Sequence, residues 1–439
     1  MTTLQESNDS RFLLLTRSEW LWLLSSVILF FFSRIFEQSG PAYQGGALYI
    51  ILNMIYLFIV FFIFRRESDH NPPRAFVFFL GVLPILFTQP LFENDHFRYL
   101  WEGKSWNLGI NPYQVAASNV ALDVENELRG LVGYPSLTTV YPFLSQAYFR
   151  IFSFFPWEYG LKAMQFISAV LVFFGFQHFW NQNNAKLFPL TVLFWQKEFI
   201  QSVHIDLLSA TIFFIWMSRD RSFRAILIGG FVKILPFLYF PFLIFKEHRS
   251  KNFWKEFMVF SFFFLIFCTI QLYLLGDLKA LTGIQSFSRQ WIWNPGLYSI
   301  LIKLFPSSYE ELRIVTFGLW GITLIFLLKW IYRYHSSEQS KWVYCFISFA
   351  TMMFCSPVYN AWYAIWFLIP ALMLNSSWGV LFALMGCWSY FFHGFPDYVW
   401  ISEVLSHILI FPAAFFLLKD FSQRVELHEE LPSTQNLAQ

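Results

Sequence analysis

The chain has 439 residues, of which 56% are hydrophobic and 22% aromatic, while only 13% are charged. A soluble domain has about 25% charged residues and cannot expose so much apolar surface, so soluble enzymes, disordered chains and disulfide scaffolds are excluded. With 30 Lys and Arg against 28 Asp and Glu, the net charge of +2 provides no basic field for nucleic acid. The composition therefore indicates a polytopic membrane protein whose first partner is the lipid bilayer.

The N-terminal part carries three apolar runs, at residues 20–36, 47–64 and 75–90. Each approaches the roughly 20 residues that a helix needs to cross a bilayer. The loop between the second and third runs contains Arg65, Arg66 and Arg74, and the positive-inside rule places it in the cytoplasm. The weakly hydrophobic stretch from residue 91 to 138 is then predicted to be a large extracytoplasmic loop.

Further apolar runs complete the predicted bundle. The run at 225–245 contains Gly229, Gly230, Lys233 and Pro236, which predicts a broken or re-entrant segment rather than a simple span. We expect an all-α polytopic membrane protein with about 11–13 transmembrane helices, the number depending on segments 187–195 and 225–245. The other runs lie at 140–155, 161–180, 199–218, 257–276, 313–332, 343–356, 362–374, 379–392 and 400–418. The predicted organisation is three membrane helices in 1–90, the large loop with the candidate site in 91–138, the remaining bundle in 139–420 and a cytoplasmic polar tail in 421–439.

The densest polar and aromatic segment follows the third run directly. Asp95, Arg98 and Glu102 are spaced i, i+3 and i+7, so they share one face if the segment is helical. Tyr99 and Trp101 then point elsewhere and suit an aromatic belt at the membrane interface. Two interpretations remain open. The segment is either an amphipathic helix with its charges toward water, or it carries a general base with a cation beside it for an anionic group.

Four ionisable residues lie in or beside apolar runs, namely Glu198, His204, Asp206 and Lys233. Burying Lys or Asp at the centre of a membrane helix costs about 2.5–3.5 kcal/mol, so such groups are either functional or paired with one another. A salt bridge from Lys233 to Glu198 or Asp206 is the purely structural interpretation. His204 and Asp206 would give a divalent cation two ligands, which do not make a site, so no cofactor is predicted and a cation requirement stays open.

The string Asp95-His96-Phe97-Arg98-Tyr99-Leu100-Trp101-Glu102-Gly103, followed by Gly109-x-Asn111-Pro112-Tyr113, carries a family resemblance. It resembles the first-loop signature of bacterial polyprenol-phosphate-dependent mannosyltransferases of the glycosyltransferase C superfamily. Members read Asp-Asp-x-x-Arg-Tyr-x-Trp-Asp-Gly and then Gly-x-Asn-Pro-Tyr. Here Asn94 replaces the first Asp and Glu102 replaces the later one.

Weaker matches follow in the order of the family, and together they extend the resemblance from Glu93 to Pro370. Where members have a His-Pro pair before Trp-Tyr, this chain has Asn360-Ala361, so no role carries over to that position. The matching segments are Val140-Tyr141-Pro142 with Gln146, Glu198 with His204-Ile205-Asp206, the Lys233 to Pro236 stretch, Trp293 to Leu297, and Ser356-Pro357 with Trp362-Tyr363 and Trp366.

The resemblance implies an inverting hexosyltransferase that moves a sugar, mannose in this family, from a polyprenyl-phosphate donor to a hydroxyl of a glycan or glycolipid acceptor. It also implies an integral multi-pass protein of the bacterial inner membrane, with its site on the outer face and Asp95 as general base. The leaving phosphate needs cations or donors, for which the candidates are Arg98, His204, Lys233 and Arg289. The other predicted substrate-binding residues are Tyr99, Glu102, Asn111, Tyr113, Tyr141, Gln146, Glu198, Asp206, Trp293, Asn294, Trp362 and Tyr363.

A transporter or lipid flippase is the alternative, because broken helices and buried charges occur there too. Inverted internal repeats would support it, and the two halves of this sequence show no convincing self-similarity. A purely structural scaffold does not explain the buried charges. Trp293, Trp362 and Tyr363 are either stacking platforms for sugar rings or ordinary interfacial anchors.

Overall fold

The computed structural model describes residues 15–38, 43–64, 72–121, 125–183, 187–248, 252–276, 281–306, 309–333, 339–393 and 399–430. Within these ranges the chain is helical, with one isolated bridge between Trp293 and Val358 and no strand. The elements are α1 (Arg17–Gln38), α2 (Tyr43–Phe64), α3 (Ala75–Leu86), α4 (Asp95–Asn107), η2 (Ala117–Asn119), α5 (Asn126–Leu131), α6 (Phe143–Phe152), α7 (Trp157–Asn183), α8 (Phe188–Phe194), η3 (Trp195–Gln201), α9 (Asp206–Ser218), α10 (Ser222–Val232), η4 (Leu235–Tyr239), α11 (Phe240–Glu247), α12 (Phe253–Leu275), α13 (Thr282–Gln290), α14 (Leu297–Leu304), α15 (Tyr309–Arg333), α16 (Ser340–Cys355), η6 (Ala361–Ala364), α17 (Ile365–Met373), α18 (Ser377–Leu384), η7 (Met385–His393), α19 (Val399–His407) and α20 (Ile410–Glu430).

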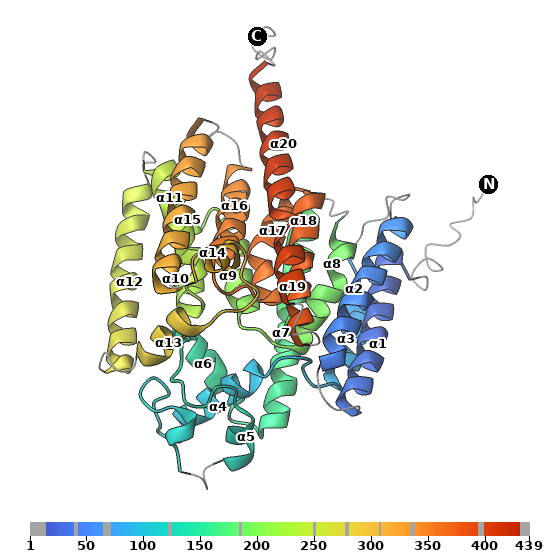
Figure 1. The fold of residues 1–439 in the computed structure, drawn as a ribbon, viewed down its shortest axis with the longest axis vertical. Coiled ribbons are helices and arrows are strands. Elements are labelled where there is room, and N and C mark those ends of the chain that lie inside the picture. Colours follow the sequence, from blue (N-terminus) through green and yellow to red (C-terminus); the bar gives the residue numbers. More distant parts are fainter. Residues whose placement is uncertain are drawn as a thin grey trace, which may run out of the picture.

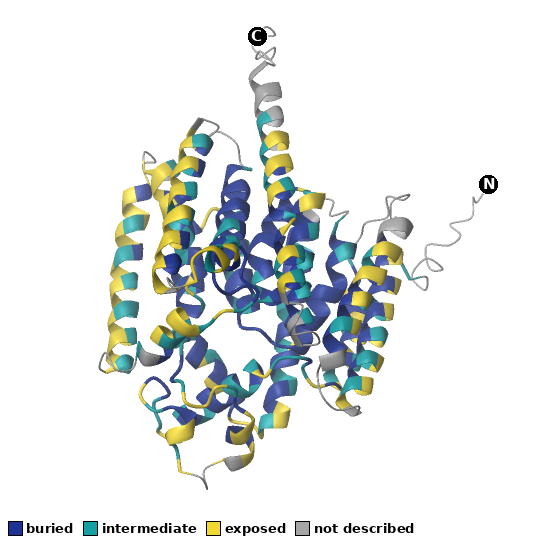
Figure 2. Cartoon of the chain, in the orientation of Figure 1, coloured by how far each residue is buried: buried dark blue, intermediate teal, exposed yellow. Residues whose placement is uncertain are grey.

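These helices confirm an all-α polytopic membrane protein. α1, α7, α12, α15 and the segment Trp400–Asp420 are long and apolar enough to cross a bilayer, and further apolar helices have 10–17 residues. The outer faces of α12 and α15 are exposed and apolar, as expected of helices that face acyl chains, whereas α16 and α17 are buried at the centre (Figure 2). The exposed apolar faces of α12 and α15 are therefore expected to meet lipid, while the core lies around α16 and α17.

The N-terminal helices brace the short π-helix η3. Trp22 of α1 is buried, and its indole nitrogen donates to the carbonyl of Phe78 in α3 over 2.8 Å. From η3, Gln196 and Gln201 donate to the hydroxyls of Ser26 and Ser33 on α1, each over 2.7 Å. These small polar residues of α1 accept hydrogen bonds from the N–H groups of the buried amides, which helps η3 to carry polar side chains inside the bundle.

Helices α4, α5 and α6 lie together at one end of the molecule, opposite the C-terminal end of α20 (Figure 1). The prediction of a membrane helix at 140–155 was wrong, because α6 has 10 residues and packs against α4. A Cβ atom on Gly103 of α4 would lie 2.3 Å from the carbonyl oxygen of Phe149 in α6, so only glycine allows this approach. The apolar face of α6 is covered by protein rather than by lipid.

The predicted interfacial position of Tyr99 and Trp101 was also wrong. Both side chains are buried, and the Tyr99 ring stacks on Phe149 with ring centroids 4.5 Å apart. Stacking against α6 removes more apolar surface from water than a position in the headgroup layer would. These aromatic rings therefore form the core that joins α4 to α6.

Two apolar runs are broken where polar residues occur. The prediction of one helix over 199–218 was wrong, because η3 ends at Gln201, Val203 adopts a positive φ of 52°, and α9 begins at Asp206. The run at 225–245 is broken as predicted, since α10 ends before Lys233 and η4 follows. A β-branched residue with positive φ is strained, and such strain is typical of functional sites.

Segments predicted to lie on the outer face contact one another. The backbone nitrogen of Gly283 in α13 donates to the hydroxyl of Thr138 over 3.2 Å, and that of Trp293 donates to the carbonyl of Pro357 over 2.9 Å. The basic loop at 65–71 lies outside the described residues, as does the Pro396-Asp397 turn. The orientation of the bundle across the membrane therefore stays a prediction.

Candidate active site

Asp95, the first residue of α4, is the accessible carboxylate of the candidate site. Its Oδ2 atom lies 4.0 Å from Nδ1 of His204, and 32% of its side chain is exposed. An acidic residue in the first turn also interacts favourably with the positive end of the helix dipole. The fold therefore holds this carboxylate at a helix terminus where a substrate can reach it.

Lys233 lies in the break between α10 and η4. Its Nζ donates to Oδ2 of Asp206 over 3.0 Å, and Oδ1 of Asp206 accepts a hydrogen bond of 2.9 Å from the indole of Trp366. The Lys233 ammonium also lies 5.5 Å from the ring centroid of Tyr141 and 5.2 Å from that of Tyr363. The salt bridge expected from the sequence thus forms with Asp206, while 18% of the lysine side chain remains exposed.

Beneath these two groups, η3 carries a fully buried ion pair. Nζ of Lys197 lies 3.2 Å from Oε2 of Glu198, which also accepts a hydrogen bond of 2.8 Å from the hydroxyl of Tyr390. Lys197 contacts the same Tyr390 hydroxyl. Removing one partner would leave an uncompensated charge inside the protein, which is strongly destabilising. The three groups therefore hold one another in place. π-Helices are rare and occur frequently at functional sites, which is consistent with this position.

His204 lies between Asp95 and the buried ion pair. Its ring stacks on Trp362, with centroids 3.9 Å apart and an interplanar angle of 11°. Its Nε2 atom lies 3.9 Å from Oε2 of Glu198, so the two ring nitrogens face two different carboxylates. Neither nitrogen has a hydrogen-bond partner among the described residues. The imidazole is therefore fixed by packing and by the strained turn at Val203.

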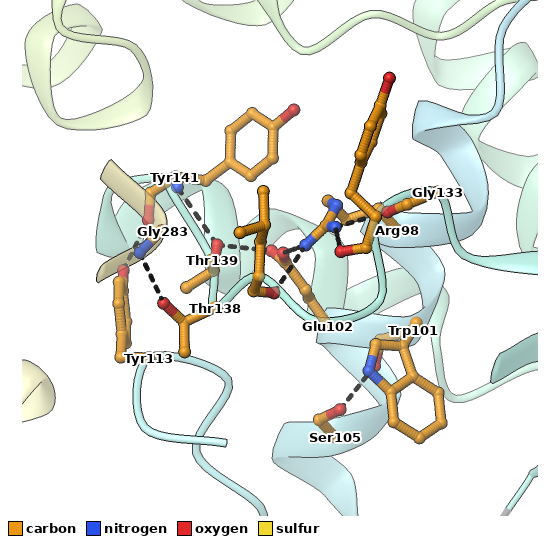
Figure 3. Close-up of polar contacts among 12 residues, drawn as sticks. Arg98, Trp101, Glu102, Ser105, Tyr113, Gly133, Thr138, Thr139, Tyr141 and Gly283 are labelled. Carbon is orange, nitrogen blue, oxygen red and sulfur yellow. Dashed lines mark hydrogen bonds and ion pairs between the residues drawn. The ribbon is translucent and has the colours of Figure 1, made fainter. Parts of the chain in front are cut away.

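A second network ties the loop after α5 to α4 (Figure 3). Arg98 donates to the carbonyls of Gly133 at 2.5 Å and Tyr134 at 2.7 Å, and it lies 3.4 Å from Oε1 of Glu102. Oε2 of Glu102 accepts hydrogen bonds from the Thr139 hydroxyl at 2.7 Å and from the Gln146 amide at 2.6 Å. These contacts engage Arg98, Glu102 and Gln146 in holding the loop, alongside the roles predicted for them.

Asn111 and Tyr113 anchor the same region to the bundle. The Asn111 amide donates to the carbonyl of Leu274 in α12 over 2.6 Å, and the Tyr113 hydroxyl donates to the carbonyl of Tyr141 over 2.7 Å. The Tyr99 ring meets Tyr141 edge to face, with centroids 5.3 Å apart. Together these bonds fix the backbone at Tyr141, which brings its ring to the Lys233 ammonium.

The acidic groups of this region have shifted proton affinities. Burial raises the pKa of Asp95 above its usual value, and Asp206 adds to the rise, although the charges of Lys233 and Arg98 lower it. Burial likewise raises the pKa of Glu102, against the lowering effect of Arg98 and of its hydrogen bonds. Burial, assisted by the charge of Lys162, lowers the pKa of His96 to about 3, so this imidazole stays neutral.

The remaining predicted residues occupy other positions. Arg289 is exposed in the last turn of α13. Asn294 is buried and accepts a hydrogen bond of 3.1 Å from the hydroxyl of Ser402, and Trp293 pairs with the backbone at Val358. These last two residues hold the segment that leads into η6 and Trp362.

Sequence reasoning missed two members of the buried cluster. Lys197 was detectable, because it is a second charge beside Glu198 in an apolar run. Tyr390 had no local signal, since it lies 192 residues from Glu198 in the chain and is one of many aromatic residues. Among the described residues, no group of three or more His, Cys, Asp or Glu side chains is arranged to hold a metal ion.

Comparison with known proteins gives a match for the N-terminal part of the chain. Residues 25–131 match the family of alpha-(1->6)-mannopyranosyltransferase N-terminal domains (MptA_B_family). No curated protein and no solved structure matches the chain. The matched segment covers about a quarter of the chain and contains the whole of α4, including Asp95, Arg98 and Glu102. The match supports a mannosyltransferase, and the helices make it a membrane-embedded one.

Proposed function

We propose that this protein transfers a mannosyl group from a polyprenyl-phosphate donor to an acceptor hydroxyl at the outer face of the membrane. The observation that carries the proposal is the partial exposure of Asp95 and Lys233, whereas Asp206, Glu198 and Lys197 are buried. A reachable carboxylate with a reachable cation near it suits the attack of a neutral hydroxyl and the departure of an anion.

In this mechanism Asp95 accepts the proton of the acceptor hydroxyl as its oxygen attacks the anomeric carbon. The bond from that carbon to the phosphate oxygen breaks, and its electron pair leaves with the phosphate. Attack from the face opposite the phosphate inverts the anomeric centre. The phosphate needs no proton, because the second pKa of a phosphate monoester is about 6.

Lys233 is proposed to stabilise the departing phosphate. Its bond to Asp206 fixes one N–H group and leaves the others available, and charge-assisted hydrogen bonds to phosphate are among the strongest. The rings of Tyr141 and Tyr363 flank the ammonium and limit the directions from which an anion can approach. Trp362, which contacts His204, is proposed to border the sugar. We propose that Arg98 acts mainly through the loop that it holds.

Purified protein in lipid nanodiscs, supplied with polyprenyl-phosphate [¹⁴C]mannose and a mannoside acceptor, tests this function. Asp95→Asn keeps the size of the side chain and should lower the transfer rate by about 10²–10⁴-fold, the usual contribution of a general base. Asp220→Asn is the matched control, because the Asp220 side chain is 78% exposed and bonds only Lys341 among the described residues. Unchanged transfer by Asp95→Asn, or transfer from GDP-mannose in place of the lipid donor, would refute the proposal.

Accessibility labelling tests the proposed face of the membrane. Ser118 is exposed in η2, so a Ser118→Cys variant in a Cys268→Ser background presents one accessible thiol while Cys345, Cys355 and Cys387 stay buried. An impermeant maleimide added to intact cells should label this thiol. Labelling only after the membrane is permeabilised would place the candidate site on the cytoplasmic face and contradict the proposal.

A further inference from the structure

The buried imidazole of His204 lies behind the proposed base and has no hydrogen bond within the part of the chain that the structure describes. We propose that His204 receives the acceptor proton from Asp95 during sugar transfer and that Glu198 sets the tautomer that makes this transfer work. This inference rests on the proposed function, and it names a second proton acceptor for the same site.

The geometry of the ring supports a proton-transfer role. Nδ1 lies 4.0 Å from Oδ2 of Asp95, and Nε2 lies 3.9 Å from Oε2 of Glu198. A movement of about 1 Å by the partly exposed Asp95 carboxylate would bring its Oδ2 atom to hydrogen-bonding distance of Nδ1. Apo sites often show catalytic hydrogen bonds that are long and tighten when substrate binds.

Burial makes the absence of hydrogen bonds informative. His204 is buried, and an unpaired polar atom inside a protein lowers its stability. The positive φ of Val203, the preceding residue, adds backbone strain. A ring that served only to fill space would be replaced at lower cost by an apolar side chain. The fold thus keeps two unpaired ring nitrogens between two carboxylates.

Glu198 decides which nitrogen carries the proton. A neutral imidazole has one N–H, and the Glu198 carboxylate attracts it to Nε2, which leaves the lone pair of Nδ1 facing Asp95. Lys197 and Tyr390 hold Glu198 by contacts of 3.2 and 2.8 Å to its Oε2 atom, so the carboxylate cannot turn away.

The proton can be followed through the step. The acceptor O–H breaks as the bond from its oxygen to the anomeric carbon forms, and the proton passes to Oδ2 of Asp95 and onward to Nδ1 of His204. His204 becomes an imidazolium with one N–H toward each carboxylate, and Asp95 becomes a carboxylate again. When the products leave, the proton returns through Asp95 to water, because a buried ring disfavours a lasting positive charge.

This second transfer benefits the reaction because it keeps Asp95 ionised. Glycosyl transfer passes through a centre of oxocarbenium character, whose positive charge a neighbouring carboxylate stabilises. If the proton stayed on Asp95, that stabilisation would be lost as the charge develops. As in a catalytic triad, a buried carboxylate, here that of Glu198, orients a histidine. The catalytic carboxylate, that of Asp95, lies on the other side of the His204 ring.

His204→Phe is the first test variant. The phenyl ring keeps the stacking on Trp362, and no hydrogen-bond partner is orphaned, so folding should be retained. With the lipid-phosphate mannose donor in excess, single-turnover transfer should fall by about 10²-fold, within the range of acid–base effects. The wild-type rate in mixtures of H₂O and D₂O should fit two moving protons, and the variant should fit one. His248→Phe, at an exposed histidine, is the matched control and should change neither result.

His204→Ala distinguishes proton transfer from packing. Free imidazole should restore its transfer rate by filling the vacated position, whereas pyrrole, a ring of the same size without a basic nitrogen, should not. Equal rescue by pyrrole, or a wild-type single-turnover rate in His204→Phe, would overturn the relay and leave the proposed function standing. Failure of the wild-type protein to transfer mannose from the lipid donor would overturn the proposed function and the relay together.

Discussion

Arg98 is predicted to act by holding the loop at 132–139, and replacing it with Met tests this directly. Met keeps the length of the aliphatic stem and removes the guanidinium. The two short bonds to the carbonyls of Gly133 and Tyr134 would be lost, together with longer ones to Leu137 and Glu102. Each charged hydrogen bond contributes about 1.5–3 kcal/mol.

The expected magnitude follows from the exposure of these groups. Tyr134 is exposed, so we take the low end of that range for each short bond and estimate a loss of about 3 kcal/mol in the free energy of opening the loop. That loss should speed amide hydrogen exchange in the loop by about 10²-fold. The amides of Leu137 and Thr139 are the reporters, because they donate to the carbonyls of Tyr134 and Pro112.

Arg150→Met is the matched control. Arg150 is exposed and donates to the side chain of Asn107 over 2.9 Å, so its loss should cost within about 0.5 kcal/mol and leave loop exchange unchanged. Exchange is measured by mass spectrometry, and donor KM is measured on the same preparations. If Arg98→Met left loop exchange unaltered while raising the donor KM tenfold or more, Arg98 would bind the phosphate directly and the anchoring argument would be wrong.

Gly103→Ala should lower protein stability by about 1–3 kcal/mol, because the new Cβ would lie 2.3 Å from the backbone oxygen of Phe149. In the control variant Gly130→Ala the new Cβ meets no atom within 4 Å, so stability should be nearly unchanged. Thermal unfolding in detergent compares the two, and equal midpoints would contradict the packing assigned to α4 and α6. Lys233→Met should move the acid limb of the kcat/KM profile to higher pH, because Asp95 acts as a base when ionised and the Lys233 charge lowers the Asp95 pKa. A shift of that limb to lower pH would show that the limb does not report Asp95.

That the protein lies in a membrane could be predicted from its composition, because a high apolar content and a scarcity of charge follow from the residue types alone. The same holds for the choice of Glu198, His204, Asp206 and Lys233 as candidates, since the cost of placing a charge among apolar neighbours is evident before any partner is known. The break at Lys233 was predictable from Gly and Pro nearby, and it is present between α10 and η4.

The identity of the partners was not predictable in this way. A run such as 140–155 is apolar whether its face meets lipid or another helix, so hydropathy could not show that α6 packs on α4. From the sequence, Arg98 was expected to be a cation available to the donor phosphate. The carbonyls that accept its hydrogen bonds belong to a loop more than 30 residues away in the chain. These hydrogen bonds depend on distances between Arg98 and the loop carbonyls in the folded chain, which a local sequence pattern does not show.

The sequence by itself determined that this is a membrane protein with a few costly charges, one of them following the third apolar run in a string that resembles a mannosyltransferase signature. The tertiary structure decided how those charges are arranged. Lys233 pairs with Asp206, while Glu198 pairs with Lys197 and Tyr390, and His204 is left between two carboxylates. Burial energy is set mainly by residue type, whereas pairing depends on which atoms the fold brings within a few ångströms, and only the folded chain specifies that.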